Sequence, residues 1–445
     1  MKVHDVFFWC ACFFLIGVLV ASIASGFERQ YLIFGLVVLL IGVFIFFVQN
    51  FNHGMLSRGI AALSLVMFIG GAYYFAHDFY QKDEVLKFGE KINFTGVIRD
   101  VKFGLENQKI RIGEIQITAQ RYPEFEYGDK VSVDGIIKEI PEEWQGYFSK
   151  EDIFGLMGFP KMELISQNNG SAIKAGLLKI NLAIQDSFKK VLPLEKATFL
   201  SGLTLGETGE FSEEFEEKLR LTGTTHLVAL SGYNIAVIAT VVLLALNRWF
   251  SRWTSSLFAI IVIISFVVMT GAEASVVRAA LMAMVLTIAE HSSRQYYFRN
   301  AIVFVALLMV LANPKVLVFD VGFQLSFLAT LGIVYLRPVL KNKLGFNDEP
   351  GFLSWKDNLL TTSSAQIVVL PILIFSFGQF SPFSLLTNVL ILEFIPVTMA
   401  IGFFIAIAGI FFSSLAFILS LAIQPLLFYI FGVINIFSFI QSKIF

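Results

Sequence analysis

The stretch Thr224–Ala239, TTHLVALSGYNIAVIA, opens an apolar run that continues to Leu246. A run of this length can cross a bilayer, since a spanning helix needs about 20 mainly apolar residues. Its first half nevertheless carries three polar side chains, His226, Ser231 and Asn234. Polar side chains at membrane depth normally face protein or a water-filled cavity. The stretch therefore predicts a segment that lines a polar path through a membrane protein.

The composition of the whole chain supports this class. Of its 445 residues, 56% are hydrophobic and only 15% are charged, which lies outside the range of soluble domains. Several further apolar runs approach or exceed the length of a membrane span. We therefore predict an α-helical polytopic membrane protein. The two cysteines, Cys10 and Cys12, both lie in the first apolar run and do not form a disulfide framework.

Changes in hydrophobicity and residue pattern along the sequence divide the chain into four predicted parts. These are N-terminal transmembrane helices at 1–80 (apolar runs 7–25, 30–48 and 59–77), a soluble domain at 88–166, amphipathic interfacial helices at 167–222, and a second membrane block at 223–445. Proline interrupts several runs after residue 370. We expect some segments there to be re-entrant or broken helices, and the number of spans after residue 350 stays open.

The segment 88–166 alternates polar and apolar residues over several short stretches, such as 92–101, 108–119 and 129–140. This pattern predicts a small extracytoplasmic β-barrel, with the OB-fold as the expected form. Residues 88–165 contain ten Lys/Arg and fourteen Asp/Glu, a net charge of −4. A domain that binds nucleic acid normally presents a basic face. A structural or gating role is therefore favoured over DNA capture, although Lys109, Arg111 and Arg121 leave a local basic patch open.

Basic residues of the second membrane block fall in clusters near 248–252, 294–299 and 337–343. Short loops rich in Lys and Arg stay in the cytoplasm. Alternating spans then place the N-terminus inside and the OB-like domain outside. We expect a multi-pass protein of the cytoplasmic, or inner, cell membrane.

Two further apolar segments carry polar side chains. Arg278 lies one or two turns into an otherwise apolar segment, where an arginine costs about 2.5–3.5 kcal/mol on insertion scales. It therefore needs an aqueous cavity, the interface or a partner, for which Glu273 and Asp320 are candidates. The second segment, 313–333, contains Asp320, Gln324 and Ser326. Hydroxyls can bond within their own helix, so the carboxyl and amide groups are the stronger signals there.

Several catalytic signatures are missing from the sequence. It contains no G-x-x-x-x-G-K-[ST] loop, and its five histidines form no metal-binding grouping. His226 and Ser231 are five residues apart, which points them to different sides of a helix, and no G-x-S-x-G elbow is present. The sequence predicts no catalytic residue, metal site or cofactor, and a membrane hydrolase built on this pair is the least favoured alternative.

Three ordered motifs resemble those of the ComEC-type competence proteins, the inner-membrane channels for DNA uptake. His226-Leu-Val-Ala-Leu-Ser231-Gly232-Tyr-Asn234 is similar to the H-L-x-A-x-S-G-x-[HN] signature. Arg278 falls in a segment like the family's R-A-x-x-M stretch, and 319–327 resembles its D-x-G-F-Q-L-S-F motif. The Tyr127-Gly128-Asp129 turn and Gly146-Tyr147-Phe148 also resemble the family's extracytoplasmic domain.

This resemblance implies a competence-type channel domain at 223–445 that conducts single-stranded DNA across the membrane. Many family members continue into a metallo-β-lactamase-like domain, which we do not find in the sequence to Phe445. We therefore expect a short form that relies on a separate nuclease, a DNA receptor and a cytoplasmic helicase. The predicted pore-lining residues are His226, Ser231, Asn234, Arg278, Asp320, Gln324 and Ser326.

The main alternative is a transporter or export channel for another polar substrate, with the OB-like domain in a regulatory role. The acidic domain favours this alternative, and the three motifs oppose it. The sequence also leaves open whether a pore would lie within one chain or between copies in a homo-oligomer.

Overall fold

The fold was analysed in a computed structural model that describes residues 3–24, 54–80, 88–230, 232–291, 297–345, 355–378 and 381–444. The chain forms two compact units that alternate along the sequence. Unit 1 comprises Met1–Gly89, Ile137–Gly155 and Leu281–Gln324, and unit 2 comprises Glu90–Ile136, Leu156–Ala280 and Leu325–Phe445. The predicted apolar run 30–48 lies outside the described residues. The four predicted domain boundaries stay a prediction.

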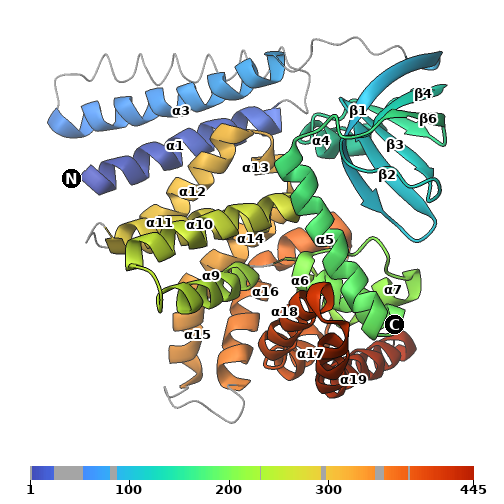
Figure 1. Cartoon of the computed structure of the whole chain (residues 1–445). Helices are drawn as coiled ribbons and strands as arrows, with labels where there is room; N and C mark the ends of the chain where they lie inside the picture. Colours follow the sequence, from blue (N-terminus) through green and yellow to red (C-terminus); the bar gives the residue numbers. More distant parts are fainter. Residues whose placement is uncertain are drawn as a thin grey trace. The chain divides into compact units, whose positions relative to one another are not determined.

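Unit 1 is built mainly from helices. They are α1 (Val3–Ala24), α3 (Gly54–Tyr80), α4 (Glu142–Ser149), α12 (Phe298–Ala312) and α13 (Val316–Phe319), together with the C-terminal part of α11 (Ala274–His291) and the first residues of α14 (Val321–Leu331). Helices α1 and α3 lie side by side (Figure 1). Glycine allows their backbones to approach closely: a Cβ atom on Gly70 would overlap the carbonyl oxygen of Phe14. Small residues at such contacts are typical of helix pairs in membranes.

Besides the first part of α11 and the last part of α14, the helices of unit 2 are α5 (Ala172–Val191), α6 (Leu194–Leu205), α7 (Glu213–Thr222), α8 (Thr225–Val228), α9 (Gly232–Leu246), α10 (Arg252–Met269), η1 (Gly332–Leu336), α15 (Arg337–Leu344), α16 (Trp355–Phe377), α17 (Ser384–Ile391), α18 (Ile395–Phe411) and α19 (Ser413–Ile444). Of these, α5 to α8 and α17 to α19 share a continuous hydrophobic core. Phe199, Phe215 and Phe431 pack ring against ring at its centre. Nine-tenths or more of each of these side chains is buried, so α6, α7 and α19 share one core.

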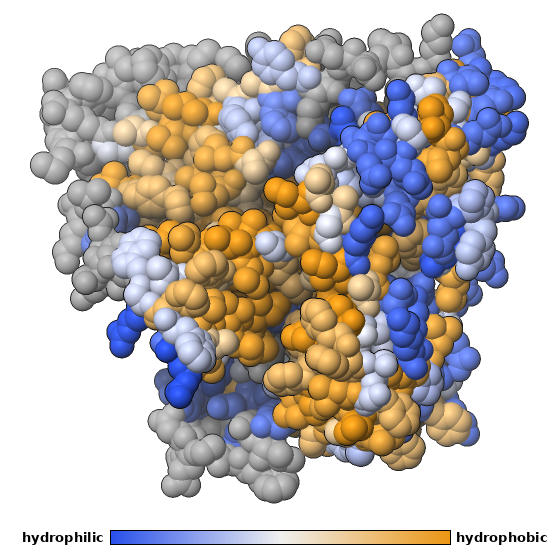
Figure 2. All heavy atoms as spheres, in the orientation of Figure 1, coloured by the Kyte–Doolittle hydropathy of each residue, from blue (hydrophilic) through white to orange (hydrophobic). Residues whose placement is uncertain are grey.

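Five described helical segments are long and apolar enough to cross a membrane: His4–Ala24, Arg252–Met269, Val321–Leu344, Trp355–Phe377 and Ser413–Lys443. The pair α17 and α18, bent by 54° at a short break, could supply a sixth. In Figure 2 the side chains over α10 and α18 are mainly hydrophobic, whereas many over the strands are hydrophilic. This composition is that of a multi-pass membrane protein.

The predicted β-domain is present, but it is a sheet and not a closed barrel. Its strands are β1 (Lys91–Phe103), β2 (Asn107–Ile112), β3 (Ile115–Gln120), β4 (Lys130–Ile136), β5 (Gly155–Gly158) and β6 (Lys161–Ser166), in the order β5-β3-β2-β1-β4-β6. The long β1 pairs antiparallel with β4 along its first half and with β2 along its second, with an irregularity between Ile98 and Asp100. The predicted period-two pattern is confirmed: Ile110, Ile117 and Val131 are completely buried.

The expectation of an OB-fold barrel is wrong because the two outer strands, β5 and β6, do not close the sheet. They follow each other in the chain but pair with β3 and β4, at opposite ends of the strand order. Between them lie Phe159, with φ +48°, and Pro160. A left-handed residue followed by a proline, which has no N–H, interrupts a strand ladder at this point.

The apolar runs also contain breaks that the sequence pattern only partly indicated. The run that begins at Thr224 divides into α8 and α9, and the second of these begins at Gly232. A further break at Asp320 separates α13 from α14. Of the prolines after residue 370, Pro371 and Pro425 lie inside continuous helices and do not interrupt their runs. A proline removes one backbone hydrogen bond, which a long and well-packed membrane helix can tolerate. The bent pair α17 and α18, with Pro396 in the first turn of α18, is a broken segment of the kind expected there.

The contact between α1 and α3 predicts a marked difference between two adjacent glycines. Gly70→Ala should destabilise unit 1 by about 1–3 kcal/mol, the usual cost of overpacking a tight contact, because the new methyl group meets the backbone of Phe14. Gly71→Ala is the matched control, since its Cβ would lie 3.5 Å from the nearest atom, an ordinary contact distance. Thermal unfolding in detergent measures both, and equal unfolding temperatures would contradict the predicted contact.

Candidate translocation site

Three elements of unit 2 meet at Arg278, on α11. Its Nε donates a hydrogen bond to Ser326 Oγ on α14 at 2.7 Å. One of its terminal nitrogens lies 3.6 Å from where a Cβ atom would stand on Gly232, at the start of α9. The guanidinium also lies 5.8 Å from the ring centre of Phe327. Two predicted residues from distant parts of the sequence, Arg278 and Ser326, are thus in direct contact.

The backbone break between α8 and α9 is held in place by α11. Ser275 Oγ donates a hydrogen bond to the carbonyl oxygen of Leu230 at 2.7 Å. Ser275 lies almost one turn before Arg278 on the same helix. A Cβ atom on Gly232 would lie 3.5 Å from the Ala279 Cβ atom and 3.6 Å from an Arg278 terminal nitrogen, which are ordinary contact distances. The start of α9 therefore lies directly beside α11.

Asn234 is buried in the first turn of α9, with 4% of its surface exposed. Its Nδ2 donates a hydrogen bond to the carbonyl oxygen of Leu203 at 3.0 Å. Leu203 lies in the last turn of α6, where backbone carbonyls have no partner within the helix. The asparagine therefore joins the start of α9 to the end of α6. This contact gives Asn234 a structural role whatever else it does.

His226 and Ser231 belong to the same predicted motif but are less informative. The His226 side chain is exposed, and its Nδ1 lies 3.1 Å from the carbonyl oxygen of Gly223. Ser231 lies outside the described residues. The role of both residues in lining a path stays a prediction.

Asp320 and Gln324 belong to unit 1, and both bind groups of that unit. Asp320 Oδ1 accepts a hydrogen bond from the backbone N–H of Phe323 at 3.0 Å, which caps the start of α14. Its Oδ2 forms an ion pair with Lys150 Nζ at 3.1 Å. Gln324 Nε2 donates to the carbonyl oxygens of Leu317 and Val318. These contacts fix the turn between α13 and α14.

The partner of Asp320 could not be recognised in the sequence. Lys150 follows α4, 170 residues before Asp320, and its side chain is only 11% exposed. Two further contacts tie this segment to the same turn: Asn313 Nδ2 donates to the Lys150 carbonyl oxygen at 2.6 Å, and a Cβ atom on Gly146 would overlap the Phe319 ring. The motif around Asp320 therefore also anchors the chain that leaves the β-domain.

Polar side chains at residues 361–366, which precede Pro371 on α16, also make contacts within and between helices. Gln366 Nε2 donates to Ser384 Oγ at 2.6 Å, which joins α16 to α17. Ser364 Oγ bonds to the Leu360 carbonyl within α16. A Cβ atom on Gly332 would crowd the Ser364 carbonyl oxygen, so η1 packs closely against α16. Within the described ranges, no group of three or more His, Cys, Asp or Glu residues is arranged to hold a metal ion.

We expect Lys150 and Asp320 to stabilise unit 1 as a pair. Lys150→Met should destabilise it by about 3–5 kcal/mol, because an unpaired carboxylate stays behind in a largely buried place. Adding Asp320→Asn should recover much of that loss, since the amide oxygen can still cap Phe323. Lys161→Met removes a highly exposed ion pair with Glu163 and should have little effect. Additive losses in thermal unfolding of the double variant would contradict this coupling.

Comparison with known proteins relates this arrangement to one family. The family model described as "Competence protein" matches residues 203–445, more than half of the chain. This region contains α8, α9, α11 and α14, and with them the contact between Arg278 and Ser326. The match begins near the end of α6 and extends to the last residue of the sequence.

A relative in Bacillus subtilis (strain 168), ComE operon protein 3, is 27% identical over 247 residues. This alignment covers 55% of the present chain and 30% of the relative, so the chain matches less than a third of that protein. No solved structure matches the chain. Because the family model covers more than half of its length, the protein belongs to the competence protein family.

Proposed function

We propose that this protein is a channel that conducts single-stranded DNA across the cytoplasmic membrane during natural transformation. The observation that carries the proposal is the contact between Arg278 and Ser326 beside Gly232, inside the region that matches the competence family. The three elements concerned come from separate parts of that region. Their polar groups would contribute to one route for a polar substrate.

The chemistry of this cluster suits transient contact with a polyanion. An arginine guanidinium is permanently charged and presents five N–H donors, which match the oxygens of a phosphate group. The serine hydroxyl can donate or accept as the strand passes. Conduction requires contacts that are favourable enough for entry and weak enough for release. One guanidinium among hydroxyl and backbone groups meets this requirement better than a dense basic patch would.

The other parts of the proposal rest on the sequence and on family membership. We propose that the β-domain lies on the outer side of the membrane, as the distribution of Lys and Arg in the short loops favours. A separate nuclease, a DNA receptor and a cytoplasmic helicase would prepare and pull the strand. His226 and Asn234 would lie near the outer opening, and Asp320 and Gln324 would hold the α13–α14 turn.

Transformation frequency tests the role of Arg278. Arg278→Gln should lower transformation by at least tenfold while the protein still inserts, because the charge that meets phosphate is lost. Arg278→Lys should recover only part of the activity, since a lysine is a point charge without the planar donor geometry. Arg248→Gln removes the same charge from an exposed position between α9 and α10 and is the matched control. Normal DNA uptake by correctly inserted Arg278→Gln would refute this role.

A transporter or export channel for another polar substrate is the second candidate function. The net charge of −4 over residues 88–165 favours it, because an acidic domain repels a phosphate backbone. The purified protein in liposomes distinguishes the two candidates when a gradient drives labelled single-stranded DNA or small polar solutes. Uptake of solutes without DNA would favour this second function.

A further inference from the structure

A cavity of about 300 Å³ lies in unit 2, between the β-domain and the helices α5 and α6. Its walls come from β1, the 125–129 loop, both helices and the 207–210 loop. The size lies at the lower end of the range for small-molecule sites. Four carboxylates line it, from Glu126, Asp129, Glu207 and Glu210, against one ammonium group, that of Lys179. The cavity therefore favours positive charge.

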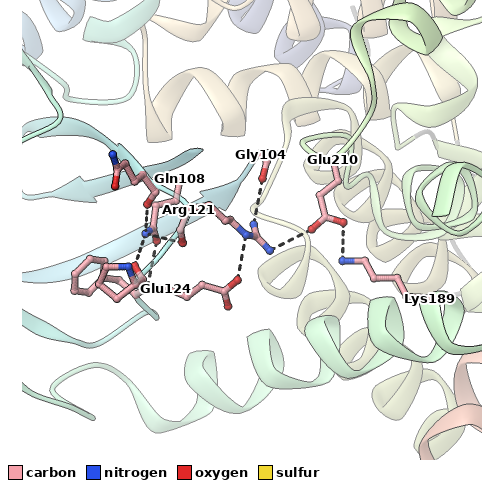
Figure 3. Close-up of polar contacts among 9 residues, drawn as sticks. Gly104, Gln108, Arg121, Glu124, Lys189 and Glu210 are labelled. Carbon is pink, nitrogen blue, oxygen red and sulfur yellow. Dashed lines mark hydrogen bonds and ion pairs between the residues drawn. The ribbon is translucent and has the colours of Figure 1, made fainter. Parts of the chain in front are cut away.

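Glu210 already has cationic partners. Figure 3 shows its carboxylate between Lys189, at 2.6 Å, and Arg121, at 3.3 Å. Arg121 also contacts Glu124 at 3.1 Å and donates to the carbonyl oxygen of Gly104. Asp129 accepts a hydrogen bond from the backbone N–H of Glu126. The two cations thus balance the Glu210 and Glu124 carboxylates, whereas Asp129 is bound by a backbone N–H.

Glu207 is different. Its Oε1 accepts a hydrogen bond from Asn181 Nδ2 at 3.2 Å, and the same amide nitrogen donates to the carbonyl oxygen of Met269. Among the described residues, no lysine or arginine forms an ion pair with Glu207 within 4.0 Å. Burial raises the pKa of this carboxyl group, and the negative charges of Asp100 and Glu273 raise it further, while Asn181 and the more distant Lys102 lower it. An ionised Glu207 is thus incompletely compensated.

A second polar group of the cavity wall is the Ser201 hydroxyl. Ser201, on α6, is only 3% exposed, and its Oγ has no hydrogen-bond partner among the described residues. A buried hydroxyl without a partner is uncommon in folded proteins because it loses its bonds to water. Ser201 and Glu207 line the same cavity. Together they offer a hydroxyl and a carboxylate oxygen, to which the described residues contribute only the Asn181 amide as a hydrogen-bond donor.

We propose that this cavity binds a small organic cation, a protonated alkylamine whose ammonium group contacts the Glu207 carboxylate and the Ser201 hydroxyl. An ammonium group has three donors and no acceptor, which complements these two groups. The apolar wall formed by Phe103, Phe125 and Leu178 accommodates the alkyl chain. Anions such as phosphate are excluded by the surrounding carboxylates. This site lies apart from the Arg278 cluster, and its existence does not depend on DNA conduction.

Calorimetric titration with n-butylamine, which is protonated at neutral pH, tests the site in the purified full chain, in a neutral detergent. We expect saturable binding with one butylamine per chain. Glu207→Gln should weaken binding by about tenfold or more, because it removes a charge-assisted hydrogen bond. Ser201→Ala should weaken it by a smaller factor. Glu106→Gln is the matched control: its exposed carboxylate lies on the β1–β2 turn, outside the cavity, and binding should be unchanged.

A cavity-filling variant, Ala175→Phe, tests the location without any change of charge and should also abolish binding. Binding should weaken as the pH is lowered through the raised pKa of Glu207, since the protonated carboxyl group no longer attracts a cation. Size-exclusion elution verifies that each variant is folded. Absence of saturable binding to the unchanged protein would overturn the proposal. Binding by Glu207→Gln and Ala175→Phe as tight as that of the unchanged protein would also overturn it. If the unchanged protein does not bind, Lys179 is the cation that balances the carboxylates of the cavity.

Discussion

The constraint that governs this structure is that a polar group removed from water must find another partner. In unit 2, several of these partners lie on another helix. Arg278 bonds to Ser326, Asn234 to the end of α6, and Gln366 to Ser384. Each bond joins two helices and fixes how they pack. The polar residues of the membrane block therefore hold its helices together.

The same groups explain why the helices break where they do. At Asp320 the carboxylate caps α14, while Gln324 binds the carbonyl groups at the end of α13. A helix that ends inside an apolar environment leaves backbone groups without partners, and these side chains supply them. Irregular backbone at membrane depth is tolerated only where it is buried in protein or lines a water-filled cavity. Asp320 and Gln324, which belong to a competence-type motif, thus stabilise the helix ends at this break.

Between the β-domain and its neighbouring helices, the groups that find partners are oppositely charged side chains. The carboxylate of Glu210 is shared between Arg121, from the sheet, and Lys189, from α5. This network joins the strands to the helices of unit 2 and leaves the cavity beside Glu207 open. The excess of acidic residues in the domain is therefore not spread evenly as a solvated surface. Part of it lines the cavity, which is why the proposed ligand is a cation.

The sequence by itself determined the class of the protein, the alternation of membrane and β segments, and the residues of the family motifs. These features depend on hydrophobicity, period and local spacing, all of which act over short distances along the chain.

Only the tertiary structure decided that the sheet stays open, that Arg278 binds Ser326 while Asp320 binds Lys150, and that Ser201 and Glu207 share a cavity. Each of these depends on contacts between residues from about 6 to 170 positions apart. Polar residues at a given depth have many candidate partners, and packing of the whole chain selects among them.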